Sequence, residues 1–309
     1  MQPSRSLKFQ LFASIGIGML AAQSVVAQEQ NLPFDVFGEA VSNQQIYRYI
    51  ESQGEELVAA QPEDAVETLY ESLDSAASTC QLRIESLTSS SSVEKDELYQ
   101  HMVKSSLYVG ELYDCGRCDR THAGFSGGVL ISEDGLALTN YHVLDRNEAR
   151  LTEGYMAMTY DGRCFEIQEI LAANKDADIA LIRLKADGFK FYAAPLASVR
   201  PNPVESIRIV SNPKGEFFVT TQGEVSRYAK VRKQTWMEVT AEFGGGSSGS
   251  GVFNDRGEVV GIVSRIKPLI RDSKSTNRGS DKNSKGSFVE MILRRCVPLS
   301  EIQACFAKE

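Results

Sequence analysis

A serine lies inside a glycine-rich turn at residues 246–251, and this stretch carries the most suggestive chemistry of the chain. The turn reads Gly-Ser-Ser-Gly-Ser-Gly and lies between two strand-like runs, residues 235–240 and 258–263. Glycine adopts backbone angles that larger residues avoid, and it lets bare N–H groups point at a developing negative oxygen. Glycine and serine are also common in ordinary hairpin loops, so the pattern alone leaves open a turn without chemistry.

A histidine and an aspartate upstream could activate such a serine. His142 lies in Thr-Asn-Tyr-His-Val-Leu after a strand-like run, and Asp178 heads the apolar run Ile-Ala-Leu-Ile. A serine hydroxyl is not ionised near neutral pH and needs a base within hydrogen-bond reach, and histidine titrates in this range. The chain order His, Asp, Ser is that of the chymotrypsin-type triad, and it differs from the orders in subtilisins and α/β-hydrolases.

Four motifs in this order resemble trypsin-like serine peptidases of the bacterial Deg type. The resemblance covers roughly residues 104–296, and its motifs are Gly-Phe-Ser-Gly-Gly-Val-Leu-Ile-Ser-Glu-Asp-Gly (124–135), Thr-Asn-Tyr-His-Val (139–143), Asp-Ile-Ala-Leu (178–181) and Gly-Ser-Ser-Gly-Ser-Gly (246–251). It implies an all-β, chymotrypsin-like fold of two six-stranded antiparallel β-barrels. The first barrel would carry His142 and Asp178, and the second would carry Ser248. No PDZ-like module is expected after the second barrel.

The resemblance also implies a role for each residue. Ser248 would attack a peptide carbonyl, and His142 would take the serine proton and return it to the leaving amine. Asp178 would orient the imidazole and stabilise its protonated form. The backbone N–H groups of Gly246 and Ser248 would form the oxyanion hole. No metal or organic cofactor is implied.

Neighbouring positions leave specificity and loop rigidity open. Ser247 stands where the family often has an acid or amide, and Ser250 stands where it usually has a second glycine. By the resemblance, Glu242 would lie at the primary specificity pocket, where an acid could favour Arg or Lys in the substrate. Alternatively, Glu242 braces the loop by accepting backbone N–H groups. Asp176 is the rival acid, but only Asp178 directly precedes Ile-Ala-Leu.

The elements that must position these residues change character near residue 105. Residues 28–104 are predicted to be a helical segment, in which apolar residues recur every three or four positions from Pro62 to Leu87 and predict a helix with one apolar stripe. Its apolar face would pack against the barrels or serve oligomerisation. Beyond it, short strands between turns predict barrels over residues 105–194 and 195–309, the second with a polar loop at 270–286 and a short final helix.

The first 27 residues are predicted to be a signal peptide. Arg5 and Lys8 precede a mostly apolar run, and Val25-Val26-Ala27 offers small residues for cleavage. An uncleaved membrane anchor is the alternative. The prediction implies a periplasmic or secreted protein with no stable membrane insertion after cleavage.

Six cysteines follow the predicted signal peptide, and an even count in an exported chain fits disulfides. Cys296 and Cys305 flank a short turn and form a plausible local pair. Cys115 and Cys118, in Cys-Gly-Arg-Cys, could be a redox motif or, with His122, a zinc site that lacks a fourth ligand at the usual spacing. A structural disulfide is the favoured interpretation.

The charge and the motifs together predict the function. The 309-residue chain has a net charge of −8, which argues against nucleic acid or an anionic membrane as partner. The expected partner is a protein or peptide substrate. We therefore predict an exported serine endopeptidase. The alternatives are a non-catalytic binding or scaffold protein on a protease fold, and a thiol oxidoreductase.

Overall fold

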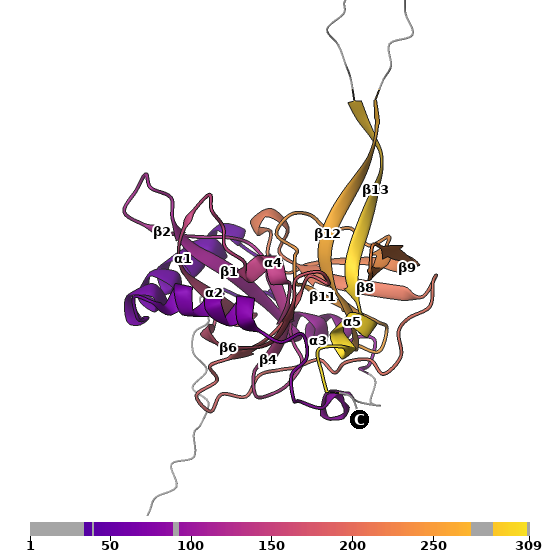
Figure 1. Ribbon diagram of the computed structural model, residues 1–309, viewed down its shortest axis with the longest axis horizontal. Helices are drawn as coiled ribbons and strands as arrows, with labels where there is room; N and C mark the ends of the chain where they lie inside the picture. The colour runs from indigo at the N-terminus through magenta and orange to yellow at the C-terminus, as the bar shows by residue number, and fades with distance from the viewer. Residues whose placement is uncertain (1–33, 39, 89–92, 273–286, 308–309) are drawn as a thin grey trace, which may run out of the picture. The chain divides into compact units, whose positions relative to one another are not determined.

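The computed structural model describes residues 34–38, 40–88, 93–272 and 287–307, and this part of the chain is mostly β (Figure 1). The predicted signal peptide and residues 273–286 of the predicted polar loop lie outside the described residues. Among the helices that are described, none has the length and apolar character needed to cross a membrane.

The first barrel is closed by six antiparallel strands in the order β1-β3-β4-β7-β6-β5, because β5 pairs back with β1. Alternate residues of β1 pack into different parts of the core: Leu107 and Val109 face one cluster, and Tyr108 and Leu112 face another. The strands are β1 (Ser106–Asp114), β3 (Gly127–Leu130), β4 (Leu136–Thr139), β5 (Leu151–Thr159), β6 (Cys164–Asn174) and β7 (Ile179–Leu184), with β2 (Thr121–Ala123) added on β1.

The second barrel is closed in the order β10-β13-β12-β11-β8-β9. Its strands are β8 (Ser206–Ser211), β9 (Val219–Val231), β10 (Gln234–Val239), β11 (Gly251–Phe253), β12 (Val259–Asp272) and β13 (Ser287–Pro298). The inward residues form a separate apolar cluster that includes Ile207, Val252 and Val263. The prediction of an all-β fold with two six-stranded barrels is confirmed.

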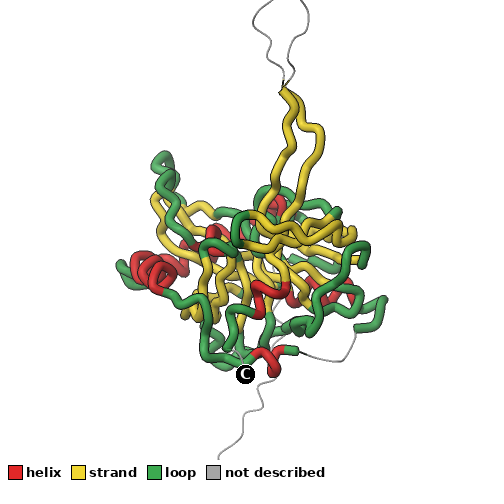
Figure 2. Tube along the Cα trace, turned by 45° about the vertical axis from the view of Figure 1, so that its right-hand side comes forward, coloured by secondary structure: helices red, strands yellow, loops and turns green. Residues whose placement is uncertain are grey.

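Strands β12 and β13 extend away from the second barrel as a long two-stranded hairpin (Figures 1 and 2). Their pairing runs from Gly261 opposite Pro298 to Asp272 opposite Ser287. The polar loop predicted from Ile270 therefore begins later, because Ile270 and Arg271 still pair with β13. Cross-strand hydrogen bonding prolonged both strands beyond their apolar runs.

The N-terminal segment contains, in its described residues, the helices α1 (Asn43–Ala60), α2 (Ala65–Ser75) and α3 (Leu98–Ser105), with a 3-10 turn at Ile84–Leu87. Helices α1 and α2 lie against the first barrel, whereas α3 also contacts the second barrel through His101, whose Nε2 is 2.8 Å from the Gly257 carbonyl oxygen. Ile46 and Ile50 of α1 are fully buried, and Tyr70 and Leu73 of α2 pack with residues of β5 and β6. The apolar faces of α1 and α2 thus pack on the first barrel. Oligomerisation through this segment stays a prediction.

The helix predicted from Pro62 to Leu87 ends at Ser75, so its predicted length was wrong. The chain beyond it bonds to distant strands and turns instead of continuing the helix. The Ala173 N–H donates to the Ala77 carbonyl at 3.0 Å, and the Cys80 N–H donates to the Cys305 carbonyl at 2.9 Å. Three short elements complete the described part: α4 (Tyr141–Leu144), a 3-10 turn at Pro213–Gly215 and α5 (Leu299–Gln303).

A buried carboxylate on β10 bridges the two neighbouring strands. Glu238 lies opposite Arg227 of β9 and Arg295 of β13, and its carboxylate accepts their Nε–H groups at 2.6 and 3.0 Å. Burial raises the pKa of Glu238, but the two guanidinium groups outweigh it and hold the pKa below its usual value.

We expect Glu238→Ala to lower the free energy of unfolding by about 3 kcal/mol at pH 7, because buried Arg295 loses its counter-charge. The folded-state pKa is depressed, so this stabilisation is present above about pH 4 and is lost as the pH falls through the folded value. Urea unfolding at pH 7 and pH 3 measures both effects. Exposed Glu224→Ala is the control, and equal losses in the two variants would refute the assignment.

Candidate active site

Two antiparallel strands bring His142 and Asp178 together. Thr139, the last residue of β4, pairs with Ala180, near the start of β7. The chain that follows β4 therefore lies beside Asp178, the residue that precedes β7. His142 lies in the single turn α4 that follows β4, and its Nδ1 is 2.8 and 3.0 Å from the two Asp178 carboxylate oxygens. The His142 backbone N–H also donates to Asp178 Oδ1 at 3.2 Å.

Ser248 joins this pair from the second barrel. Its Oγ is 2.9 Å from His142 Nε2, across a sequence separation of 106 residues. The His142 side chain is 48% exposed, whereas the Asp178 side chain is 3% exposed. The three residues therefore form one hydrogen-bonded chain that runs from a buried carboxylate to a solvent-accessible hydroxyl.

The surroundings of Asp178 keep its carboxylate ionised. Burial raises the pKa of Asp178, but hydrogen bonds from His142 and the Ser264 hydroxyl, together with the His142 charge, outweigh burial and lower the pKa. An Arg265 guanidinium nitrogen lies 3.2 Å from Oδ2. Asp178 has φ +59°, a left-handed conformation, and its carbonyl accepts the Asn140 amide at 2.8 Å.

Sequence reasoning missed Asn140, Ser264 and Arg265. Asn140 falls within a recognised motif, so its proximity to His142 was the available signal. Ser264 and Arg265 follow the apolar run of β12, and nothing in their local sequence indicates contact with Asp178. Arg265 is held in place by stacking on Trp236, with its guanidinium carbon 4.5 Å from the ring centroid.

Backbone hydrogen bonds fix the loop around Ser248. The Gly127 N–H of the first barrel donates to the Ser248 carbonyl at 2.7 Å, and the Lys214 N–H donates to the Gly245 carbonyl at 2.8 Å. The C=O and N–H of a trans peptide point in opposite directions, so the N–H of Gly246 points away from Lys214. In the described residues, the N–H groups of Gly246 and Ser248 have no assigned acceptor.

Glycine is required at the residue after Ser248. Gly249 has φ +82°, and a Cβ there would lie 2.2 Å from the Gly127 carbonyl oxygen. Ser247 and Ser250, the two residues that depart from the family motif, both fit into the closely packed loop. The Ser247 hydroxyl donates to Ser211 Oγ at 3.1 Å, and a Cβ on Gly127 would lie 2.2 Å from Ser250 Oγ. The Ser250 side chain fits because Gly127 has none.

Glu242 makes a different contact from the bracing predicted for it. Its carboxylate pairs with the Arg294 guanidinium at 3.1 Å, and its side chain is 79% exposed. It therefore accepts from a side chain, not from the loop N–H groups. The Glu242 carbonyl accepts the Thr221 hydroxyl at 2.7 Å.

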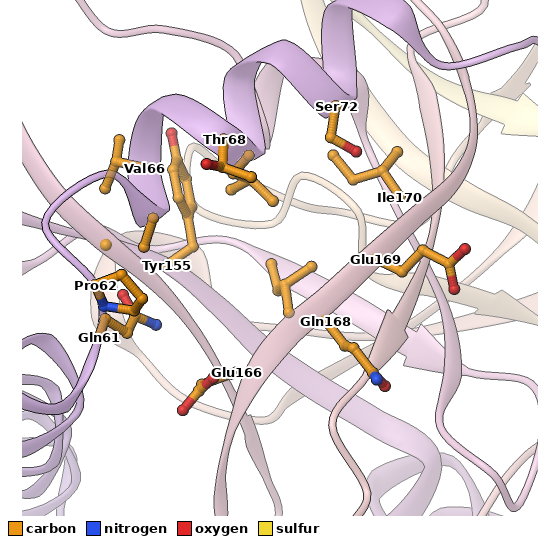
Figure 3. Close-up of a pocket in the computed structure, with 14 residues that line it drawn as sticks. Gln61, Pro62, Val66, Thr68, Ser72, Tyr155, Glu166, Gln168, Glu169 and Ile170 are labelled. Atoms are coloured by element: carbon orange, nitrogen blue, oxygen red, sulfur yellow. The ribbon is translucent and has the colours of Figure 1, made fainter.

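Two cavities of the described residues differ in their relation to the triad candidates. A groove of about 170 Å³ runs between α2 and β6, lined by residues such as Pro62, Thr68 and Ile170, and none of the triad candidates lines it (Figure 3). A cleft of about 560 Å³ lies next to Asp178, since Arg265, which lines the cleft, also contacts the Asp178 carboxylate. The other lining residues of this cleft are Lys175, Asp176, Val231, Arg232, Lys233, Gln234 and Trp236.

The cysteines are unbridged in the structure. Cys305 lies beside Cys80, to which its backbone is hydrogen-bonded, whereas Cys296 is buried in the core of the second barrel. Cys115 and Cys118 have their sulfur atoms 3.5 Å apart.

Comparison with known proteins agrees with the fold. Residues 126–262 match the family model of the trypsin-like peptidase domain. The chain is 28% identical over 169 residues to "Putative serine protease HhoA" of Synechocystis sp., covering 52% of this chain and 41% of that protein. It is 31% identical over 148 residues to "Serine protease HTRA1" of Xenopus laevis (45% and 31%), and 26% identical over 142 residues to "Serine endoprotease DegS" of Haemophilus influenzae (44% and 39%).

The predicted resemblance to trypsin-like serine peptidases of the Deg type is thus confirmed. The chain matches 41% or less of the length of these three relatives.

Proposed function

We propose that this protein is a serine endopeptidase that uses His142, Asp178 and Ser248 as a catalytic triad. The observation that carries the proposal is the unbroken hydrogen-bonded chain, 2.8 Å from Asp178 to His142 and 2.9 Å from His142 to Ser248. The serine peptidase relatives support the same activity.

The geometry supports a two-step acyl transfer. His142 Nε2 accepts the Ser248 proton as Oγ attacks the peptide carbonyl, and the buried Asp178 carboxylate stabilises the resulting imidazolium. The negative oxygen would accept hydrogen bonds from the backbone N–H groups of Gly246 and Ser248. In related chemistry, each such donor stabilises the transition state by about 3 kcal/mol. His142 then returns the proton to the leaving amine, and water hydrolyses the acyl-enzyme by the reverse sequence.

A serine-directed sulfonyl fluoride tests the proposal directly. The mature protein should gain one covalent adduct on Ser248, located by peptide mass mapping, with loss of peptidase activity in proportion. Unfolding the protein before exposure to the reagent should abolish labelling, because free serine hydroxyls are unreactive. Absence of any adduct on Ser248 in the folded protein would contradict the triad.

We also propose the domain boundaries and location expected from the sequence. Residues 1–27 form a cleaved signal peptide, residues 28–104 a helical segment, and residues 105–194 and 195–309 the two barrels of a periplasmic or secreted protein. N-terminal sequencing of the protein from the host's extracytoplasmic fraction should begin at Gln28. Recovery of uncleaved Met1 there would refute cleavage.

In an oxidising compartment, we propose that Cys80 forms a disulfide with Cys305. The hydrogen bond between their backbones at 2.9 Å supports this pairing, and Cys296 lies in a different core cluster. Non-reducing peptide mapping should recover a Cys80–Cys305 peptide. Recovery of Cys296 joined to Cys305 would reject it.

The cleft beside Asp178 supports a preference for acidic side chains in the substrate. Four of its lining residues are cationic, and one is anionic: Lys175, Arg232, Lys233 and Arg265 against Asp176. Lys175 and Arg265 already pair with Asp145 and Asp178, which leaves Arg232 and Lys233 as the cations without an assigned ion pair among the described residues.

We expect peptides with Glu upstream of the cleaved bond to have a kcat/KM about 2- to 5-fold above matched Lys peptides, the size of one exposed ion pair. Changing Arg232 and Lys233 together to Gln should remove most of this preference, and added salt should weaken it in the wild type. Lys230→Gln is the control, since Lys230 is an exposed charge near the end of β9, just before the turn that carries Arg232 and Lys233, and does not line the cleft. An equal loss in the control would assign the effect to net charge.

A further inference from the structure

A cluster of two thiols and one imidazole lies on the hairpin formed by β1 and β2. The sulfur atoms of Cys115 and Cys118 are 3.5 Å apart, and Cys118 Sγ is 3.1 Å from His122 Nε2. The ligating atoms of all three residues lie within 4.8 Å of one another. Strand pairing produces this convergence, because Asp114 and Thr121 pair across the hairpin.

Other groups hold the cluster in a form suited to metal binding. His122 Nδ1 is 3.1 Å from Glu51 Oε1 on α1, and both side chains are mostly buried, at 18% and 13% exposed. A carboxylate that accepts a hydrogen bond from one imidazole nitrogen fixes the tautomer in which the other nitrogen has a free lone pair. This arrangement is typical of metal-bound histidine. Gly116, at φ +65°, closes the turn, and its N–H donates to Asp114 Oδ1 at 2.7 Å.

We propose that Cys115, Cys118 and His122 bind a zinc ion, with a water molecule as the fourth ligand. Tetrahedral zinc, with bonds of about 2.3 Å to sulfur and about 2.0 Å to nitrogen, separates two sulfurs by about 3.8 Å and a sulfur from a nitrogen by about 3.5 Å. For these two pairs, the observed 3.5 and 3.1 Å require shifts of a few tenths of an ångström, and the ligating atoms of Cys115 and His122 lie within 4.8 Å of each other. A disulfide would require the sulfurs to close to about 2.05 Å.

The bound ion would join the helical segment to the first barrel. Two ligands come from the β1–β2 turn and one from β2, while the outer carboxylate comes from α1. Metal binding would therefore raise the stability of the contact between α1 and the hairpin, by mass action on the folded state. This role is structural and does not depend on the proposed peptidase activity.

Cobalt(II) serves as the probe, because thiolate ligands give charge-transfer bands and a tetrahedral site gives visible d–d bands. The reduced mature protein should bind one equivalent of Co²⁺ with both sets of bands, and Zn²⁺ should displace it and raise the melting temperature. Cys118→Ser should remove at least half of the charge-transfer intensity. Glu51→Gln should raise the Zn²⁺ dissociation constant about 10- to 100-fold.

Cys164→Ser is the matched control, since Cys164 is a partly buried cysteine outside the cluster, and it should bind as the wild type does. Ser248→Ala should also bind normally, which separates this proposal from the peptidase proposal. Three outcomes would overturn it: no thiolate bands in the reduced protein, bands of undiminished intensity in Cys118→Ser, or recovery of only a Cys115–Cys118 disulfide from a protein that, once reduced, fails to bind Co²⁺.

Discussion

Ser248→Ala is expected to lower kcat for casein or peptide hydrolysis by about 10⁴- to 10⁶-fold, the range for removing a triad nucleophile. The alanine methyl cannot form the acyl-enzyme, and His142 loses the hydroxyl 2.9 Å from its Nε2. The melting temperature should stay near that of the wild type, because Ser248 is partly exposed and its loop is held by the backbone. Initial rates and a thermal melt, measured on one preparation, report both quantities.

Ser250→Ala provides the control within the same loop. The Ser250 hydroxyl is buried without an assigned partner in the described residues, so its loss should leave kcat within a few-fold of the wild type. Equal activity of the wild type and Ser248→Ala would contradict the peptidase proposal. It would favour a scaffold role for the fold, which function of Ser248→Ala in the host would then test.

Asp178→Asn is expected to lower kcat at neutral pH by about 10⁴-fold while the fold persists. The asparagine amide can donate to His142 Nδ1, which selects the imidazole tautomer that presents a proton, and no lone pair, to Ser248. Ser264 and Arg265 both donate toward the wild-type carboxylate, so the neutral amide also deprives both donors of their charged acceptor. Steady-state rates at pH 7 measure the loss.

Asp176→Asn is the matched control, since Asp176 is exposed and lies two residues from Asp178. It should keep kcat within a few-fold of the wild type. Similar large losses in both variants would mean that the whole turn before β7 matters, and would reject a specific role for the Asp178 carboxylate.

The residues with candidate chemistry could be predicted from the sequence because their signals are local. The glycine-rich turn, the Asn-Tyr-His motif and the Asp-Ile-Ala-Leu motif each occupy a few consecutive positions, and their order separates them from other hydrolases. Strand alternation and turn residues are also local, so the β-rich architecture could be predicted. The resemblance then supplied the two barrels, which spacing alone does not specify.

The tertiary structure decided everything that depends on contacts between distant residues. The helix predicted from Pro62 to Leu87 is in fact α2, from Ala65 to Ser75, because the following backbone bonds to β6 and to the C-terminal turn. Ser264 and Arg265 reach Asp178 from 86 and 87 positions away, and Glu51 reaches His122 from 71 positions away. Local sequence encodes backbone preference, whereas these contacts arise only when two barrels and a helix pack at a fixed register, and no short segment contains that information.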